Sequence, residues 1–102
     1  MQSEENTLFN STQLDRAIEI LRAVTHKDRI RILELVQTKG SISVNELSEL
    51  MQTDQSLMSQ NLKILRDAGL VTTQRNGKYI YYKIAYKNLQ NVVQAVLRFH
   101  NA

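Results

Sequence analysis

The chain contains no cysteine, no proline and only three glycines among its 102 residues. The lack of cysteine excludes disulfides, thiolate metal sites and thiol redox switches. No stretch approaches the roughly 20 consecutive apolar residues of a membrane-spanning helix, and the N-terminus lacks the basic-then-apolar layout of a signal peptide. These absences predict a cytoplasmic protein with no membrane partner and few linkers.

Hydrophobic residues make up 42% of the chain, which is enough for the core of one domain of ordinary size. Residues 1–11 are mostly polar and carry acidic side chains, so we expect them to form a flexible tail. Residues 12–102 are then expected to form the single domain.

The net charge is +3, and it is unevenly distributed along the chain. Residues 1–20 hold four acidic residues against one basic residue, a balance of −3, whereas residues 55–83 hold five basic residues against one acidic residue, a balance of +4. Such a basic segment is either an ordinary solvated surface or the electrostatic footprint of a nucleic-acid partner.

Apolar residues at helical spacing predict four helices before residue 70, over about residues 13–24, 27–38, 44–51 and 55–68. Each predicted start has an N-cap residue, and at the first three an acid follows three residues later. These caps are Thr12, Thr25, Ser43 and Asp54. The apolar faces of the four helices contain Leu14, Ala17, Ile18, Leu21, Val24, Ile30, Ile32, Leu33, Leu35, Val36, Leu47, Leu50, Met51, Leu57, Met58, Leu62 and Leu65.

Two segments rich in Val, Thr, Tyr and Ile, residues 70–75 and 78–84, flank the pair Asn76-Gly77. This pair is typical of the type I′ turn that joins two antiparallel strands, because such a turn needs two positive φ angles. Residues 41–43 form a short segment that is expected to be extended, so this segment can add a small strand beside the hairpin.

Helix, tight turn, helix and hairpin follow one another between Ser43 and Tyr82, which is the order of a winged helix-turn-helix. The predicted fold is therefore mainly α-helical with a small β-hairpin, in the order α-α-α-α-β-β-α. In this fold the second helix of the motif enters the DNA major groove, and its N-terminal residues reach the base edges. The candidates for DNA contact on this recognition helix are Gln55, Ser56, Ser59, Gln60, Asn61 and Lys63.

The chemistry of these side chains suits DNA, since Gln can bond adenine at N6 and N7 together and Lys63 can contact phosphate or guanine. The alternative is a plain solvated helix face. In the hairpin, or wing, the expected phosphate contacts come from Arg75, Asn76, Gly77 and Lys78. The alternative there is that the charges protect an exposed strand edge from aggregation.

Two arginines on the second helix, Arg29 and Arg31, are expected to pair with Glu34 or other acids, and the alternative is contact with DNA backbone phosphates. Nothing in the chain has the pattern of a catalytic site, because it lacks a cysteine nucleophile, a Gly-rich phosphate loop and any serine in a recognisable nucleophile motif. The two histidines, His26 and His100, have no neighbouring set of ligands. We therefore expect no metal, no cofactor and no enzymatic activity.

Three segments resemble the ArsR/SmtB family of small bacterial transcriptional repressors: residues 26–33 (HKDRIRIL), 56–71 (SLMSQNLKILRDAGLV) and 75–82 (RNGKYIYY). The likeness extends over about residues 12–100. The order Ser-x-x-Ser-x-x-Leu-x-x-Leu-x-x-Ala-Gly-Leu-Val is fairly specific at this place. Related proteins often have His where this chain has Asn61, which is a mild departure.

The resemblance implies a homodimer that binds double-stranded DNA at a pseudo-palindromic operator near its own promoter. It also implies that the first helix and a last helix, predicted over about residues 87–100, form the dimer interface. The apolar stripes on these helices agree, because they are too apolar to stay exposed on a small domain. The expected interface residues are Leu14, Ile18, Leu21, Leu89, Val92, Val93 and Val96.

The departures from the family concern sensing. Many members carry Cys-Val-Cys where this chain has residues 43–45 (SVN), and others bind zinc at positions that match Tyr86, Asn88 and Phe99. Both familiar metal sites are therefore predicted to be missing. Three alternatives then remain for the effector: it is an unknown small molecule, it is a metal bound at another site, or the protein has no effector. The alternative function is a winged-helix module that binds a protein partner and has no operator.

Overall fold

The structure, a computed structural model, describes residues 8–85 together with residues 91, 94 and 98. The helix predicted over residues 87–100 lies outside the described residues, as do residues 1–7 of the expected tail. The described part contains α1 (Ser11–Val24), α2 (Lys27–Lys39), β1 (Ile42–Ser43), α3 (Val44–Met51), α4 (Gln55–Asp67), β2 (Val71–Asn76) and β3 (Tyr79–Ile84). The fold is mainly helical with a small antiparallel sheet, as predicted.

The helices begin where a side chain satisfies the backbone N–H groups of the first turn. Ser43 accepts from the N–H of Glu46 and Asp54 accepts from that of Leu57, so two of the predicted N-caps are confirmed. The other two predictions are wrong. α1 begins with a capping box between Asn10 and Gln13, and His26 caps α2 by accepting from Asp28.

Thr25 does not cap α2 because it ends α1 instead. Its hydroxyl donates to the carbonyl oxygen of Arg22 at 3.1 Å. The next residue, His26, is the one with the extended backbone that an N-cap requires. The connection between α1 and α2 therefore consists of only these two cap residues, Thr25 and His26.

A tight turn separates α3 from α4. Gln52 adopts a left-handed conformation, with φ of 52°, and the N–H of Thr53 donates to the carbonyl of Ser48. Asp54 then caps α4. This short connection fixes the direction in which α4 leaves the turn.

The hairpin forms as predicted, but its turn lies one residue further along the chain. Asn76 pairs with Tyr79, so Gly77 and Lys78 form the tip, and of the two only Gly77 has a positive φ. This pattern fits a type II′ turn, which needs glycine at its first central position, and not the predicted type I′ turn. β1 pairs with β3 through Ile42 and Ser43, which confirms the small third strand and gives the sheet order β1-β3-β2.

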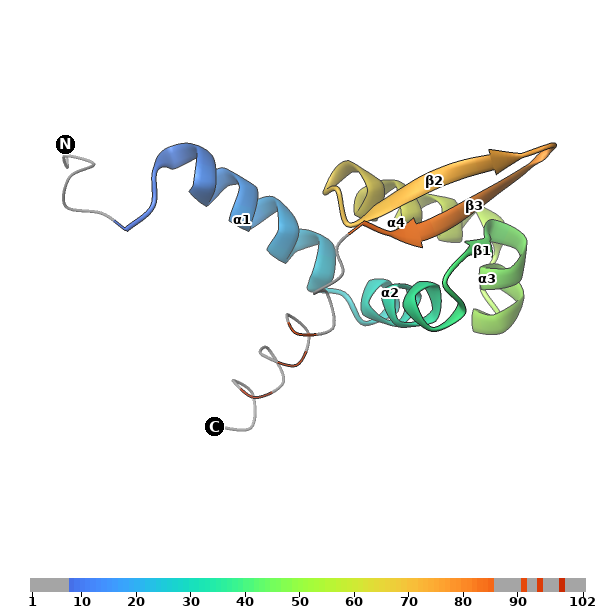
Figure 1. The fold of residues 1–102 in the computed structure, drawn as a ribbon. Helices are drawn as coiled ribbons and strands as arrows, with labels where there is room; N and C mark the ends of the chain where they lie inside the picture. Colours follow the sequence, from blue (N-terminus) through green and yellow to red (C-terminus); the bar gives the residue numbers. More distant parts are fainter. Residues whose placement is uncertain (1–7, 86–90, 92–93, 95–97, 99–102) are drawn as a thin grey trace.

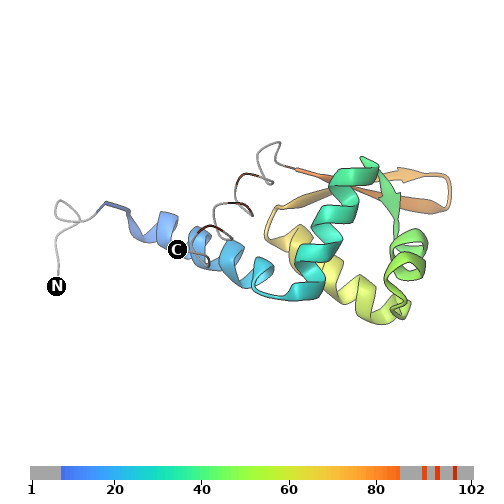
Figure 2. The same cartoon turned by 90° about the horizontal axis from the view of Figure 1, so that it is seen from below.

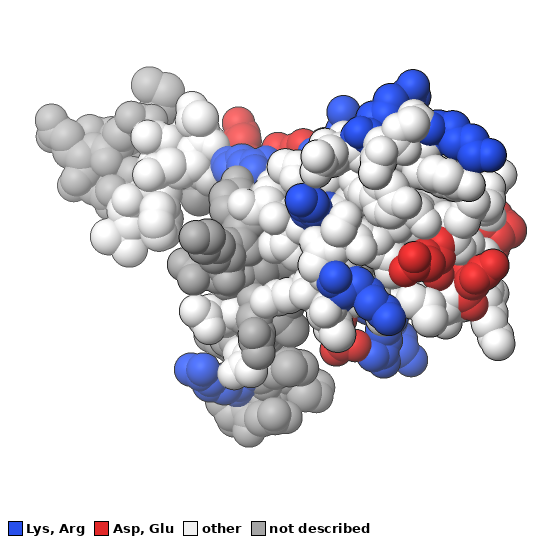
Figure 3. Space-filling model, turned by 45° about the vertical axis from the view of Figure 1, so that its right-hand side comes forward, with Lys and Arg blue, Asp and Glu red and all other residues white. Residues whose placement is uncertain are grey.

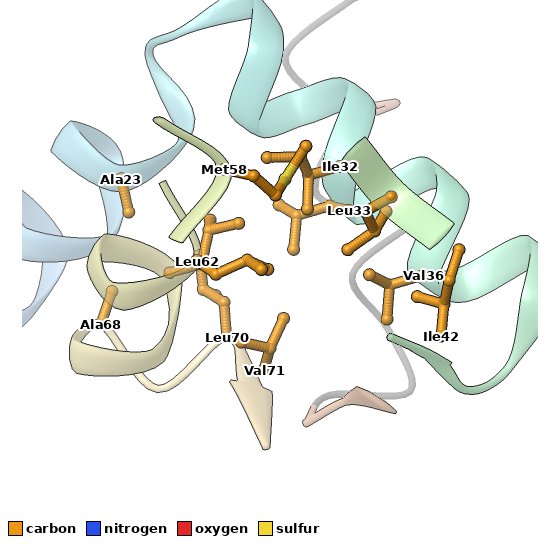
Figure 4. Packing of buried hydrophobic residues seen from close by; sticks show 12 residues of the cluster. Ala23, Ile32, Leu33, Val36, Ile42, Met58, Leu62, Ala68, Leu70 and Val71 are labelled. Carbon is orange, nitrogen blue, oxygen red and sulfur yellow. The ribbon is translucent and has the colours of Figure 1, made fainter. Parts of the chain in front are cut away.

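The hydrophobic core lies between α2, α3, α4 and the sheet (Figure 4). In Figures 1 and 2, α1 projects away from this group, while the β2–β3 hairpin protrudes at the other end. The buried apolar residues are Ala23, Ile32, Leu33, Val36, Ile42, Leu47, Met58, Leu62, Leu65, Ala68, Leu70 and Val71.

Three residues that were predicted to face inward are exposed: Ile30, Leu50 and Leu57 have 37%, 52% and 43% of their surface accessible. The buried residues of α2 are Ile32, Leu33 and Val36. In α4 the buried Met58 is one residue, and therefore about 100° around the helix, from the exposed Leu57. When apolar residues occupy adjacent positions, the sequence pattern alone does not show which of them faces the core.

Ser48 supplies a stability prediction, because its hydroxyl is buried and has no hydrogen-bond partner in the described part of the chain. Ser48→Ala removes this unsatisfied group and should raise the free energy of unfolding by about 1 kcal/mol. Ser59→Ala, at an exposed helical position, is the control for the higher helix propensity of alanine. Urea unfolding at one fixed protein concentration measures the free energy of unfolding of both variants. A smaller gain for Ser48→Ala than for the control would contradict the prediction.

Candidate nucleic-acid interface

The fold holds α4 by one face and exposes the opposite face. Met58, Leu62 and Leu65 are completely buried on the inner face. Five of the six candidates on this helix are exposed: Gln55, Ser56, Ser59, Gln60 and Lys63. A 13-residue helix is about 20 Å long, so its polar side is an outward-facing rod of the size that a major groove admits.

Asn61, the sixth candidate, is not on this surface, and its prediction as a DNA contact is corrected. Only 6% of its surface is accessible, and its Oδ1 accepts from Nη1 of Arg29 at 3.2 Å. The reason is its position on the helix, between the buried residues Met58 and Leu62, which turns it toward α2.

Arg29 connects three helices through this contact. Its Nε donates to the carbonyl oxygen of Ala23 at 2.7 Å and its Nη2 to that of Arg22 at 3.1 Å, both in the last turn of α1. Arg29 forms no ion pair with an acid among the residues that the structure describes, so the prediction for it is wrong. Arg31 pairs with Glu34 as predicted. We call the contacts of Arg29 with α1 and Asn61 the arginine junction.

Two of the candidates on α4, Lys63 and Gln55, form exposed contacts with neighbouring side chains. Nζ of Lys63 lies 2.7 Å from Asp67, and the two side chains are 75% and 62% exposed. Ion pairs as exposed as this one contribute little to stability, so Lys63 can exchange its carboxylate for a phosphate at small cost. At the start of the helix, Nε2 of Gln55 donates to Oδ1 of Asn45 on α3.

The four wing candidates, residues 75–78, lie at and beside the tip of the hairpin and are all exposed. Nζ of Lys78 lies 5.3 Å from the centre of the Tyr79 ring, a cation–π distance. Arg75 makes no ion pair within the described ranges. Figure 3 shows basic side chains gathered along the upper edge of the molecule, at the end that carries the hairpin.

A groove of about 500 Å³ separates the first turns of α3 and α4 from the wing. It brings candidates from both predicted surfaces together: Gln55 and Ser59 line one wall and Lys78 the other. The remaining lining residues are Ser43, Val44, Asn45, Tyr79 and Ile80. Sequence reasoning missed Asn45 and Ile80, since no periodicity or motif marks a residue that meets the site only through tertiary packing.

Ser43 and Asn45, where the resemblance leads us to expect a departure from the family's cysteine site, have side chains that are poor metal ligands and are hydrogen-bonded within the protein. Oγ of Ser43 accepts from the N–H of Glu46 at 3.2 Å, and Asn45 accepts from Gln55. Within the described ranges, no group of three or more His, Asp or Glu residues is placed to hold a metal ion. Tyr86, Asn88 and Phe99 lie outside the described residues.

The outer face of α1 presents the other predicted surface. Leu14, Ile18 and Leu21 are 48%, 47% and 54% exposed and lie three or four residues apart, on one side of the helix. The four other predicted interface residues, Leu89, Val92, Val93 and Val96, lie outside the described residues. No helix described in this structure is long and apolar enough to cross a membrane.

The order of elements, the outward α4 and the adjacent hairpin together define a winged helix-turn-helix protein. A model of the family described as "Bacterial regulatory protein, arsR family" matches residues 26–73. The chain is 33% identical over 98 residues to the biofilm growth-associated repressor of Xylella fastidiosa, covering 90% of this chain and 85% of that protein. This chain therefore belongs to the ArsR family of bacterial regulatory proteins.

Two further comparisons agree. The chain is 40% identical over 80 residues to the transcriptional repressor SmtB of Mycobacterium tuberculosis, covering 78% of this chain and 58% of that protein. Its structure matches the homodimeric winged helix-turn-helix DNA-binding domain of a possible ArsR-family regulator from Mycobacterium bovis with a TM-score of 0.79 and 26% identity. That match covers 98% of this chain and 90% of the other.

The arginine junction predicts unequal effects for two arginines on α2. Arg29→Ala leaves the carbonyls of Ala23 and Arg22 and the amide of Asn61 without their donor, and should lower the free energy of unfolding by at least about 2 kcal/mol. Arg31→Ala removes only an exposed ion pair and should cost less than about 1 kcal/mol. Urea unfolding followed by circular dichroism distinguishes them. Equal losses would show that the junction does not hold α1 in place.

Proposed function

We propose that this protein is a sequence-specific DNA-binding transcriptional regulator that acts in the cytoplasm as a homodimeric repressor on a pseudo-palindromic operator. The observation that carries the proposal is the exposed polar face of α4, held outward by a completely buried inner face and set beside a basic wing. Family membership supports the same function, and two of the relatives named above are called repressors.

In this proposal the two surfaces have different tasks. Gln55, Ser59 and Gln60 contact base edges in the major groove, where amide and hydroxyl groups can distinguish base pairs. Ser56, Lys63 and the wing residues Arg75 and Lys78 contact phosphates, which sets register and affinity and carries no sequence information. Bound at a promoter, the protein would block the access of RNA polymerase.

The dimer in this proposal forms through α1 and the residues that follow β3. The exposed stripe of Leu14, Ile18 and Leu21 supports it, because three large apolar side chains on one side of a helix are costly to leave in water. A two-fold axis would place the two copies of α4 one DNA turn apart, about 34 Å, and would require a pseudo-palindromic operator.

Sequence-specific binding is the first test of the proposal. The protein should select particular sequences from a randomised duplex library, with an affinity that falls steeply as salt is raised. Arg75→Ala should weaken binding to all sequences alike and reduce the salt slope by about 1 per protomer. Gln60→Ala should instead lower the preference at one base pair, by about 1–3 kcal/mol.

Fluorescence anisotropy with the selected duplex and a scrambled one measures these effects. Gln37→Ala, an exposed amide on α2, is the matched control and should change neither affinity nor selectivity. Equal affinity of the unmodified protein for selected and scrambled DNA would refute the proposal and favour a winged-helix module that binds protein.

Dimerisation is tested separately. Ile18→Glu places a charge in the proposed interface and should raise the dimer dissociation constant by at least about thirtyfold, equivalent to about 2 kcal/mol. Leu50→Glu is the control, since this leucine on α3 is as exposed as Ile18 but lies outside the α1 stripe. Sedimentation velocity distinguishes monomer from dimer. If Ile18→Glu stays dimeric at concentrations where the control does, α1 is not in the interface.

A further inference from the structure

The side-chain amide of Gln55 is hydrogen-bonded within the protein. Its Nε2 donates to Oδ1 of Asn45, ten residues earlier and across the turn between α3 and α4. Both residues are exposed and line the groove that faces the wing. Gln55 is the first residue of α4, the end from which a recognition helix reaches base edges.

Hydrogen-bond counting shows what this contact leaves available. A glutamine amide has two N–H donors and one carbonyl oxygen. Asn45 occupies one donor, so one N–H and the oxygen remain. Adenine presents one acceptor, N7, and one donor, the N6 amino group, in the major groove, whereas guanine presents two acceptors, N7 and O6. The amide of Gln55 therefore matches adenine and lacks the second donor that guanine requires.

We propose that Asn45 is a positioning residue for base readout, which orients Gln55 so that it selects adenine over guanine. This inference rests on the proposed DNA-binding function. Asn45 acts through Gln55 and need not touch DNA itself. A Gln55 amide that is hydrogen-bonded to Asn45 has less side-chain freedom to lose when it binds a base.

The experiment uses the full chain and a randomised duplex library with sequencing of the bound fraction. Comparison of the unmodified protein with Gln55→Ala identifies the base pair that Gln55 reads, as the one where the base preference is lost. The unmodified protein should prefer adenine at that base pair. At that base pair Asn45→Ala should lower the adenine-to-guanine ratio by roughly fivefold, equivalent to about 1 kcal/mol for one hydrogen bond.

Two further variants separate positioning from direct contact. Asn45→Asp keeps an acceptor at the same place, so the ratio should be retained, although the added negative charge should weaken binding to every sequence. In a Gln55→Ala background, Asn45→Ala should leave the ratio unchanged, because there is no amide left to orient. Circular dichroism checks that each variant is folded.

The outcomes distinguish this inference from the function on which it rests. If the unmodified protein selects no sequence from the library, both the role of Asn45 and the proposed sequence-specific DNA binding are refuted. Selection that Gln55→Ala does not alter, a preference for guanine at the base pair that Gln55 reads, or an equal effect of Asn45→Ala in both backgrounds would overturn the role of Asn45 and leave the DNA-binding function standing.

Discussion

Everything proposed for this protein depends on the packing of one face of α4 against α2, α3 and the sheet. Met58, Leu62 and Leu65 are completely buried there, and each such side chain contributes roughly 1.5–3 kcal/mol by its removal from water. The same burial fixes the rotation of the helix about its axis. It is this rotation that turns Ser59 and Gln60 outward.

Polar contacts at the start and in the middle of α4 add to the apolar packing in fixing the position of this helix. The left-handed Gln52 and the cap at Asp54 fix where the helix starts, and the arginine junction ties its middle to the end of α1. A dimer built on α1 would thus be connected to the recognition helix through hydrogen bonds to Arg29. The position of the proposed dimer surface on α1 relative to the exposed face of α4 therefore depends on the hydrogen bonds that Arg29 donates.

Much of this fold could be predicted because its signals are local. The bounds of the four described helices, the hairpin and the small strand at Ile42 all follow from periodicity, caps and turn residues, and the structure agrees to within a few residues. The errors about which helical side chains are buried share one cause. Leu57 precedes the buried Met58, and Asn61 lies between the buried Met58 and Leu62. Ile30 and Leu50 belong to apolar faces whose buried members include Leu33 and Leu47. The sequence does not show how far each helix is rotated against its neighbours.

By itself the sequence determined the class of the protein: the order of helices and hairpin, the basic segment beside the turn, and the motif shared with the ArsR family. Only the tertiary structure decided that Asn61 points inward to Arg29 and that Asn45 meets Gln55 across the turn. The physical reason is that element order depends on local preferences, whereas contacts between helices depend on their mutual rotation, and one residue along a helix changes the direction of a side chain by about 100°.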